Sequence, residues 1–156
     1  MPWVGSSRPF DRQVRGGPVA LPNISNGRIE VVRGALKKMA NPDQLFVTAS
    51  MTRPDHSVTG AELARIHRSQ GFSKIAVHYV IERDGAVFEG RSLDEPGCLA
   101  ARANDRSIQV CLVGGVDDAL TPTNNFSKQQ RMALRRLVLK HGLPAVFDRV
   151  CPLQEI

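Results

Sequence analysis

The segment that most restricts the fold is a nearly continuous apolar run at residues 108–113, which ends in Gly114-Gly115. A strand that is apolar on both sides must be covered on both faces, as in sheets that have parallel neighbours and flanking helices. We therefore expect a central strand here, with helices packed on its opposite faces. The run favours an α/β domain.

Two sites in the sequence have the spacing of a capping box, in which two side chains bond the free backbone N–H groups at a helix start. The pairs are Thr59 with Glu62 and Ser127 with Gln130. They predict helices near residues 60–70 and 127–141. Gly71 and Gly142 follow these segments and are typical helix stops.

Shorter β-rich segments lie before and between these helices. They predict further strands near residues 45–48, 75–82 and 86–89. Asp84-Gly85 is typical of a two-residue hairpin loop and would join the last two of these strands. The fold class expected is α/β, with a central mixed β-sheet flanked by helices.

Residues 1–44 differ in composition from the rest of the chain. They hold five of the 13 Gly and five of the 10 Pro, and they carry four of the six net positive charges. Up to residue 26 the segment has no helical or strand periodicity, although a short strand at 28–32 and a helical turn at 35–39 are possible. We expect an extended basic arm at 1–44 and a globular domain at 45–156.

Composition excludes several classes of protein. No apolar run approaches the roughly 18 residues of a membrane span, so we expect no membrane partner. The net charge is +6, but the chain has no long Lys/Arg run and only 5% aromatic residues. These two features do not favour nucleic acid as a partner. The three cysteines Cys98, Cys111 and Cys151 lack close spacing, which argues against a disulfide framework.

Four stretches occur in an order that resembles one enzyme family. They are LARIHRSQGF at 63–72, VHYVIERDG at 77–85, NDRSIQVCLVGG at 104–115, and Cys151-Pro152. Residues 45–152 resemble the zinc-dependent N-acetylmuramoyl-L-alanine amidases, which include short-tailed phage lysozymes and the peptidoglycan-recognition proteins. The resemblance implies the amidase fold and a zinc held by two histidines and one cysteine, assisted by a tyrosine and a lysine.

Most positions implied by the resemblance are changed in this sequence. Thr48 stands where the first ligand histidine is expected, and Val77 where the tyrosine is expected. Residues 144–150 contain no second histidine, while Cys151 matches the third ligand and Arg149 the lysine position. We therefore expect no bound zinc and no catalytic residues, and enzymatic activity is left open.

The histidines of the chain are His56, His67, His78 and His141. His67 lies on the apolar stripe of a predicted helix and His78 in a predicted strand, so we expect both to be packed in the core. His56 is expected in a loop. At a helix C-terminus, His141 is explained by the helix dipole.

The resemblance, together with the changed site residues, implies a pseudoenzyme of amidase-like fold, a non-catalytic structural component of a tailed phage particle. It would be made in the host cytoplasm and located in the virion, with other phage structural proteins, in multiple copies, as partners. The arm would bind neighbouring subunits through Trp3, Arg8, Phe10, Arg12 and Arg15. The alternatives are a peptidoglycan-binding protein, an active amidase (endolysin), and a regulator of phage RNA polymerase.

Overall fold

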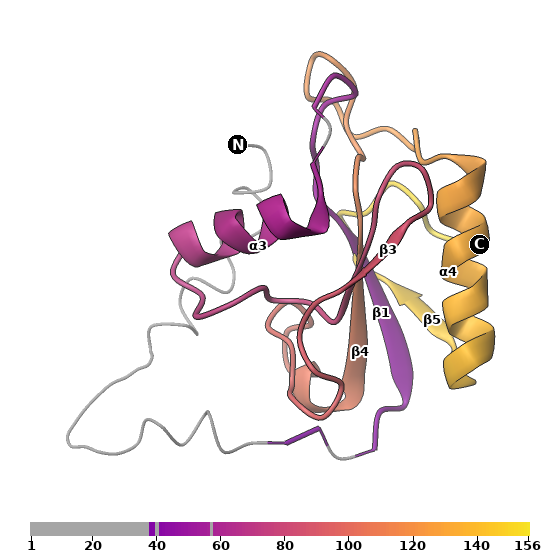
Figure 1. The fold of residues 1–156 in the computed structure, drawn as a ribbon. Coiled ribbons are helices and arrows are strands. Elements are labelled where there is room, and N and C mark those ends of the chain that lie inside the picture. Colours follow the sequence, from indigo (N-terminus) through magenta and orange to yellow (C-terminus); the bar gives the residue numbers. More distant parts are fainter. Residues whose placement is uncertain (1–37, 40, 57) are drawn as a thin grey trace.

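A five-stranded mixed sheet forms the centre of the computed structural model, which describes residues 38–39, 41–56 and 58–156 (Figure 1). The strands are β1 (Gln44–Ala49), β2 (Tyr79–Ile81), β3 (Val87–Glu89), β4 (Ser107–Leu112) and β5 (Ala145–Phe147). The helices are α3 (Gly60–Ser69), the 3-10 turn η1 (Asn104–Arg106) and α4 (Lys128–His141). The strand order is β3-β2-β4-β1-β5, and all neighbours are parallel except β2 and β3.

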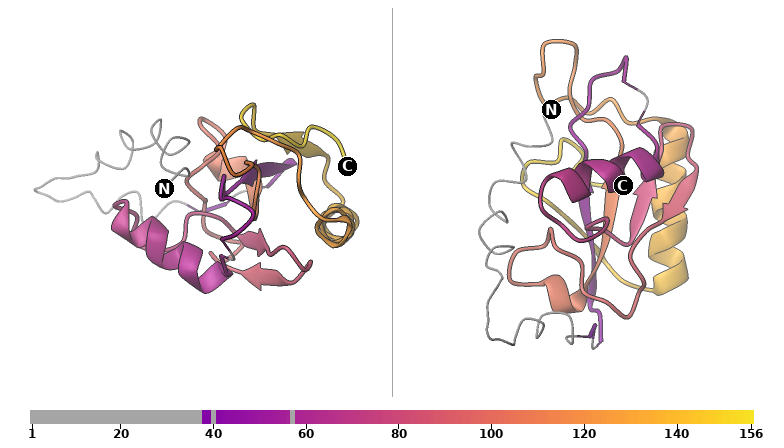
Figure 2. Two further views of the ribbon diagram at one scale, coloured as in Figure 1. Left: turned by 90° about the horizontal axis from the view of Figure 1, so that it is seen from above. Right: turned by 60° about the vertical axis from the view of Figure 1, so that its left-hand side comes forward.

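The central strand β4 is buried along its whole length, as expected. Its alternating side chains enter two separate cores, as the pleat of a strand requires. Val110 and Leu112 pack in the core that contains Leu134 of α4, whereas Cys111 packs in the core that contains Leu63 of α3. The two helices thus cover opposite faces of the sheet, which the turned views also show (Figure 2).

Both predicted capping boxes form. Thr59 Oγ1 accepts from the Glu62 N–H at 3.1 Å, and the Thr59 N–H donates to the Glu62 carboxylate at 2.8 Å. Ser127 and Gln130 make the same reciprocal pair at the start of α4. At the other end of α4, Gly142 has a φ of 65°, a left-handed conformation that glycine adopts without strain.

The predicted strand at 75–82 is wrong in length, because the regular strand spans Tyr79–Ile81 alone. Before it, the Ala76 N–H donates to His67 Nδ1 and the Ala76 carbonyl accepts from Cys98, so these groups are used outside the ladder. The hairpin loop is also one residue longer than predicted. Glu82 pairs with Ala86, and the loop at 83–85 includes a glycine at a φ of 92°.

Strand β5 was not predicted, because three residues are too few to show a period. It lies at the edge of the sheet beside β1, with Leu45 opposite Ala145 and Val47 opposite Phe147. Because β1 and β5 are parallel, their C-terminal ends lie side by side at the same end of the sheet. This placement decides what surrounds Thr48.

The part of the chain assigned to the arm already packs on the domain near its end. Met39 is buried, and its N–H donates to the Asp94 carbonyl at 2.9 Å. The expected boundary after residue 44 therefore falls within the packed region. The predicted elements before residue 38 and the arm residues Trp3, Arg8, Phe10, Arg12 and Arg15 lie outside the described residues. Among the residues that are described, no helix is long and apolar enough to cross a membrane.

Candidate functional site

Two polar side chains meet where the parallel strands β1 and β5 end. Thr48 lies near the end of β1 and is 1% exposed, and Asp148 directly follows β5. The Thr48 hydroxyl donates to Asp148 Oδ2 at 3.0 Å, and the Asp148 N–H donates to the Val47 carbonyl at 2.8 Å. The carboxyl ends of parallel strands commonly carry functional groups. Asp148 was missed from the sequence, although a carboxylate directly after an apolar triplet is the signal that could have found it.

Two buried thiols accompany this pair. Cys151 follows in a turn in which its N–H donates to the Asp148 carbonyl at 2.9 Å. Burial raises the pKa of the Cys151 thiol to about 11, and the charge of Asp148 acts in the same direction. Cys111 lies opposite Thr48 in the register of β4 and β1, and burial raises its pKa well above the usual value. Both side chains are therefore protonated thiols at neutral pH.

The positions of the assisting tyrosine, the assisting lysine and the second histidine add no side chain that could bind zinc. Val77 is fully buried in the core beneath α3, and its side chain carries no polar atom. Arg149, at the position of the assisting lysine, is exposed. The segment in which the second histidine was sought holds β5 and the turn that follows it.

Two of the histidines are buried, as expected. His67 Nδ1 accepts from the Ala76 N–H at 2.9 Å. His78 Nδ1 accepts from the Gln109 N–H at 2.9 Å, and its Nε2 lies 2.7 Å from the Glu95 carbonyl. Burial lowers the pKa of both side chains, that of His67 to about 4. Both rings are thus neutral and accept a hydrogen bond through Nδ1, and His78 also donates from Nε2 to the Glu95 carbonyl.

His141 has a partner that the sequence did not indicate. Its Nε2 lies 2.9 Å from the hydroxyl of Tyr79, which starts β2. The pair joins the C-terminus of α4 to the sheet. The helix dipole is therefore an incomplete explanation of His141.

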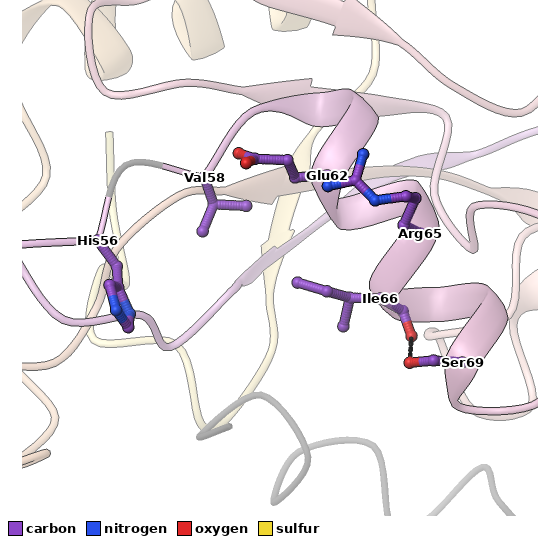
Figure 3. Close-up of a pocket in the computed structure, with 6 residues that line it drawn as sticks. All are labelled: His56, Val58, Glu62, Arg65, Ile66 and Ser69. Carbon is purple, nitrogen blue, oxygen red and sulfur yellow. Dashed lines mark hydrogen bonds between the residues drawn. The ribbon is translucent and has the colours of Figure 1, made fainter.

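A pocket of about 430 Å³ lies on the exposed side of α3 (Figure 3). Its lining residues come from α3 and from the segment that leads into it: His56, Val58, Glu62, Arg65, Ile66 and Ser69. The carboxylate of Glu62 is engaged at the helix start, where hydrogen bonds from Thr59 lower its pKa. The charge of Arg65 also lowers the pKa of Glu62, but Arg65 forms no ion pair with any described carboxylate.

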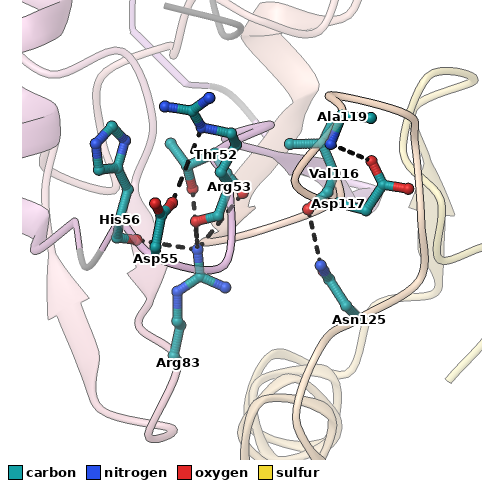
Figure 4. A network of polar contacts seen from close by, with 9 residues as sticks. All are labelled: Thr52, Arg53, Asp55, His56, Arg83, Val116, Asp117, Ala119 and Asn125. Carbon is teal, nitrogen blue, oxygen red and sulfur yellow. Dashed lines mark hydrogen bonds and ion pairs between the residues drawn. The ribbon is translucent and has the colours of Figure 1, made fainter.

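The segment that forms one wall of this pocket is held by Arg83 of the β2–β3 hairpin (Figure 4). Nη2 of Arg83 donates to the carbonyls of Arg53 at 2.6 Å and His56 at 3.0 Å. The neighbouring Glu82 accepts from the Gly60 N–H at 2.8 Å and so fixes the start of α3. The hairpin thus positions both ends of the pocket wall.

Comparison with known proteins establishes the family. Residues 41–146 match the family model described as N-acetylmuramoyl-L-alanine amidase. The chain belongs to this family. The amidase-family match includes Thr48 and the whole α3 pocket but ends before Asp148 and Cys151.

Comparisons with individual relatives support this family assignment. It is 37% identical to the endolysin of Escherichia phage T7 over 109 residues, which are 70% of this chain and 72% of the relative. It is 38% identical to the endolysin of Enterobacteria phage K11 over 112 residues, 72% of this chain and 73% of the relative. Drosophila PGRP-LB has the same fold, with a TM-score of 0.59 at 20% identity, over 74% of this chain and 78% of that one.

These relatives correct the function expected from the sequence. The main expectation, a non-catalytic structural component of a phage particle, is wrong, because the matching phage relatives are named endolysins. The alternatives that involve peptidoglycan agree better with the amidase family. A location in the virion stays a prediction.

The zinc implied by the family resemblance can be tested against the donor atoms at this site. A zinc site needs at least three protein ligands, drawn from histidine, cysteine and carboxylate groups. Within the described residues, no three such groups lie close enough to hold a metal ion. The Thr48 hydroxyl donates a hydrogen bond to Asp148, and a hydroxyl in that role is no substitute for an imidazole. The residues present do not fit the zinc of the family.

We therefore predict less than one zinc per chain after incubation with excess zinc and desalting, measured by elemental analysis. A chelator should leave the melting temperature unchanged, because a chain that binds no metal would derive no folding energy from one. Cys151→Ser is the informative variant and Cys98→Ser its control. One tightly bound zinc that is lost in Cys151→Ser and kept in Cys98→Ser would contradict the prediction.

Proposed function

We propose that the chain binds bacterial peptidoglycan through the pocket on α3. The observation that carries the proposal is that the amidase-family match spans every residue lining this pocket. Its lining residues lie on the side of α3 away from the buried Leu63 and His67, which within the described part of the chain is the side that a large polymer can reach. Binding at this pocket does not depend on the changed residues at the zinc positions.

The side chains of the pocket suit a peptide stem linked to a sugar. Such stems present carboxylates and the methyl groups of alanine. Arg65 offers a guanidinium that forms no ion pair within the described part of the chain, and Val58 and Ile66 offer apolar surface for methyl groups. His56 adds a polar ring at the pocket edge (Figure 3).

Hydrolysis of the bond between N-acetylmuramic acid and L-alanine is a second candidate function. The observation that favours it is the 37% and 38% identity to named endolysins over about 70% of the chain. The donor set at Thr48, Asp148 and Cys151 does not supply the zinc that the resemblance implies. Hydrolysis would therefore need another arrangement of the site.

The test is co-sedimentation of the full chain with purified peptidoglycan sacculi, with soluble muropeptides measured in the same samples. We expect saturable binding that Arg65→Gln weakens about tenfold, the effect of one charge-assisted hydrogen bond. Arg68→Gln is the matched control, because Arg68 is an exposed arginine of the same helix outside the pocket lining.

Absence of sedimentation with sacculi, or equal loss in the Arg65 and Arg68 variants, would contradict the proposed binding site. Muropeptide release above a buffer blank would establish the second candidate. The two readouts separate binding from hydrolysis, because sacculi can be bound without being cut.

A further inference from the structure

Helix α4 has a strongly cationic outer surface. Its sequence contains no acidic residue and several basic ones, namely Lys128, Arg131, Arg135, Arg136 and Lys140. In the described residues, none of these forms an ion pair with a carboxylate. Arg131 Nη1 donates a hydrogen bond to the Phe126 carbonyl at 2.8 Å, which leaves its positive charge in place. The positive charge of this helix is thus not neutralised by the described part of the fold.

Two large apolar side chains lie within this cationic surface. Leu139 is 77% exposed and Met132 is 42% exposed. At 100° per residue they lie about 20° apart around the helix axis, on the side opposite the buried Leu134 and Leu137. Neither side chain is part of the hydrophobic core.

The cations lie on both sides of this apolar pair. By the same helical geometry, Arg135 falls on one flank and Arg136 on the other, and both are exposed. Lys128 extends the surface by one turn toward the N-terminus, so the face runs along a helix about 21 Å long. We call Lys128, Met132, Arg135, Arg136 and Leu139 the α4 face.

We propose that the α4 face binds the surface of a bilayer containing anionic phospholipids. Cations on both flanks suit the phosphate headgroups, and the central Leu139 and Met132 suit the acyl boundary beneath them. Nucleic acid would use the cations but give no contact to two exposed aliphatic side chains, and the face carries no aromatic residue on which a base could stack. A peripheral contact of this kind needs no membrane-spanning segment.

The position of the α4 face is compatible with the proposed peptidoglycan site. α3 and α4 cover opposite faces of the sheet (Figures 1 and 2). A bilayer on the outer side of α4 would therefore leave the α3 pocket facing away from the lipid. Both ligands could be bound at once.

The test is sedimentation of the full chain with vesicles of phosphatidylglycerol and phosphatidylcholine, compared with vesicles of phosphatidylcholine alone. We expect binding to the anionic vesicles. Arg135→Gln with Arg136→Gln should weaken it about 30-fold, which corresponds to about fivefold for each cation removed near the surface. Leu139→Ser should weaken it roughly tenfold through lost apolar burial.

Matched controls separate this surface from general charge and hydrophobicity. Arg68→Gln with Arg102→Gln removes the same charge from exposed positions elsewhere, and Leu93→Ser removes an exposed leucine outside the helix. Both controls should bind as the unmodified chain does, and thermal melts should show all variants folded. Equal loss in the paired controls would overturn the proposal. So would tighter binding to duplex DNA that is insensitive to Leu139→Ser.

Discussion

Gln130→Leu should lower the free energy of unfolding by about 3 kcal/mol, a change of more than 100-fold in the unfolding equilibrium. Gln130 is 1% exposed, and its Nε2 donates to the carbonyls of Ile81 at 3.1 Å and Val113 at 2.9 Å. Its Oε1 accepts from the Ser127 N–H at 2.9 Å. Leucine has a similar size but makes none of these bonds, so the Val113 carbonyl and the Ser127 N–H lose a partner inside the protein.

The measurement is urea unfolding of both proteins at pH 7. Gln129→Leu is the matched control, since Gln129 is the exposed neighbour in the same helix turn and should change stability by no more than about 0.5 kcal/mol. If Gln130→Leu is as stable as Gln129→Leu, then the Gln130 side chain does not link α4 to the ends of β2 and β4.

Acid should destabilise the fold by about 3 kcal/mol through His67 alone. Burial, and secondarily the charge of Arg91, lowers the pKa of His67 from 6.5 to about 4. Between these two pH values the unfolded chain binds a proton that the folded chain does not. The stability that depends on neutral His67 is therefore complete above pH 6.5 and is lost as the pH falls toward 4.

Urea unfolding at a series of pH values between 7 and 4 measures this loss. His67→Asn removes the titrating ring and keeps an acceptor for the Ala76 N–H, so it should show a shallower pH dependence. His78 is also buried with a lowered pKa and contributes in the same direction, which leaves a residual slope in the variant. Identical slopes in the two proteins would show that His67 does not carry this linkage.

Much of the architecture could be predicted because its signals are local. A capping box joins groups three residues apart, so Thr59 with Glu62 and Ser127 with Gln130 locate two helix starts without reference to the rest of the chain. The double-sided burial of β4 follows from its own apolar side chains. The family resemblance rests on the same stretches, and it identified the fold although the function first expected was wrong.

The candidate site was harder to predict, because its groups are distant in the sequence. Thr48 was recognised as a change at a ligand position, but its hydrogen bond to Asp148 spans 100 residues. Arg83 likewise reaches across 27 residues to the His56 carbonyl, and nothing in its local sequence indicates which loop it holds.

The sequence by itself determined the helix starts, the central strand, the absence of a zinc-ligand side chain at Thr48 and the absence of a tyrosine at Val77, since these depend on residue identity and short-range spacing. The tertiary structure alone decided that β5 pairs with β1 and so places Asp148 beside Thr48. A three-residue strand has too few side chains to specify its partner locally. Its position is fixed by the backbone hydrogen bonds of an edge that exists once the rest of the sheet has formed.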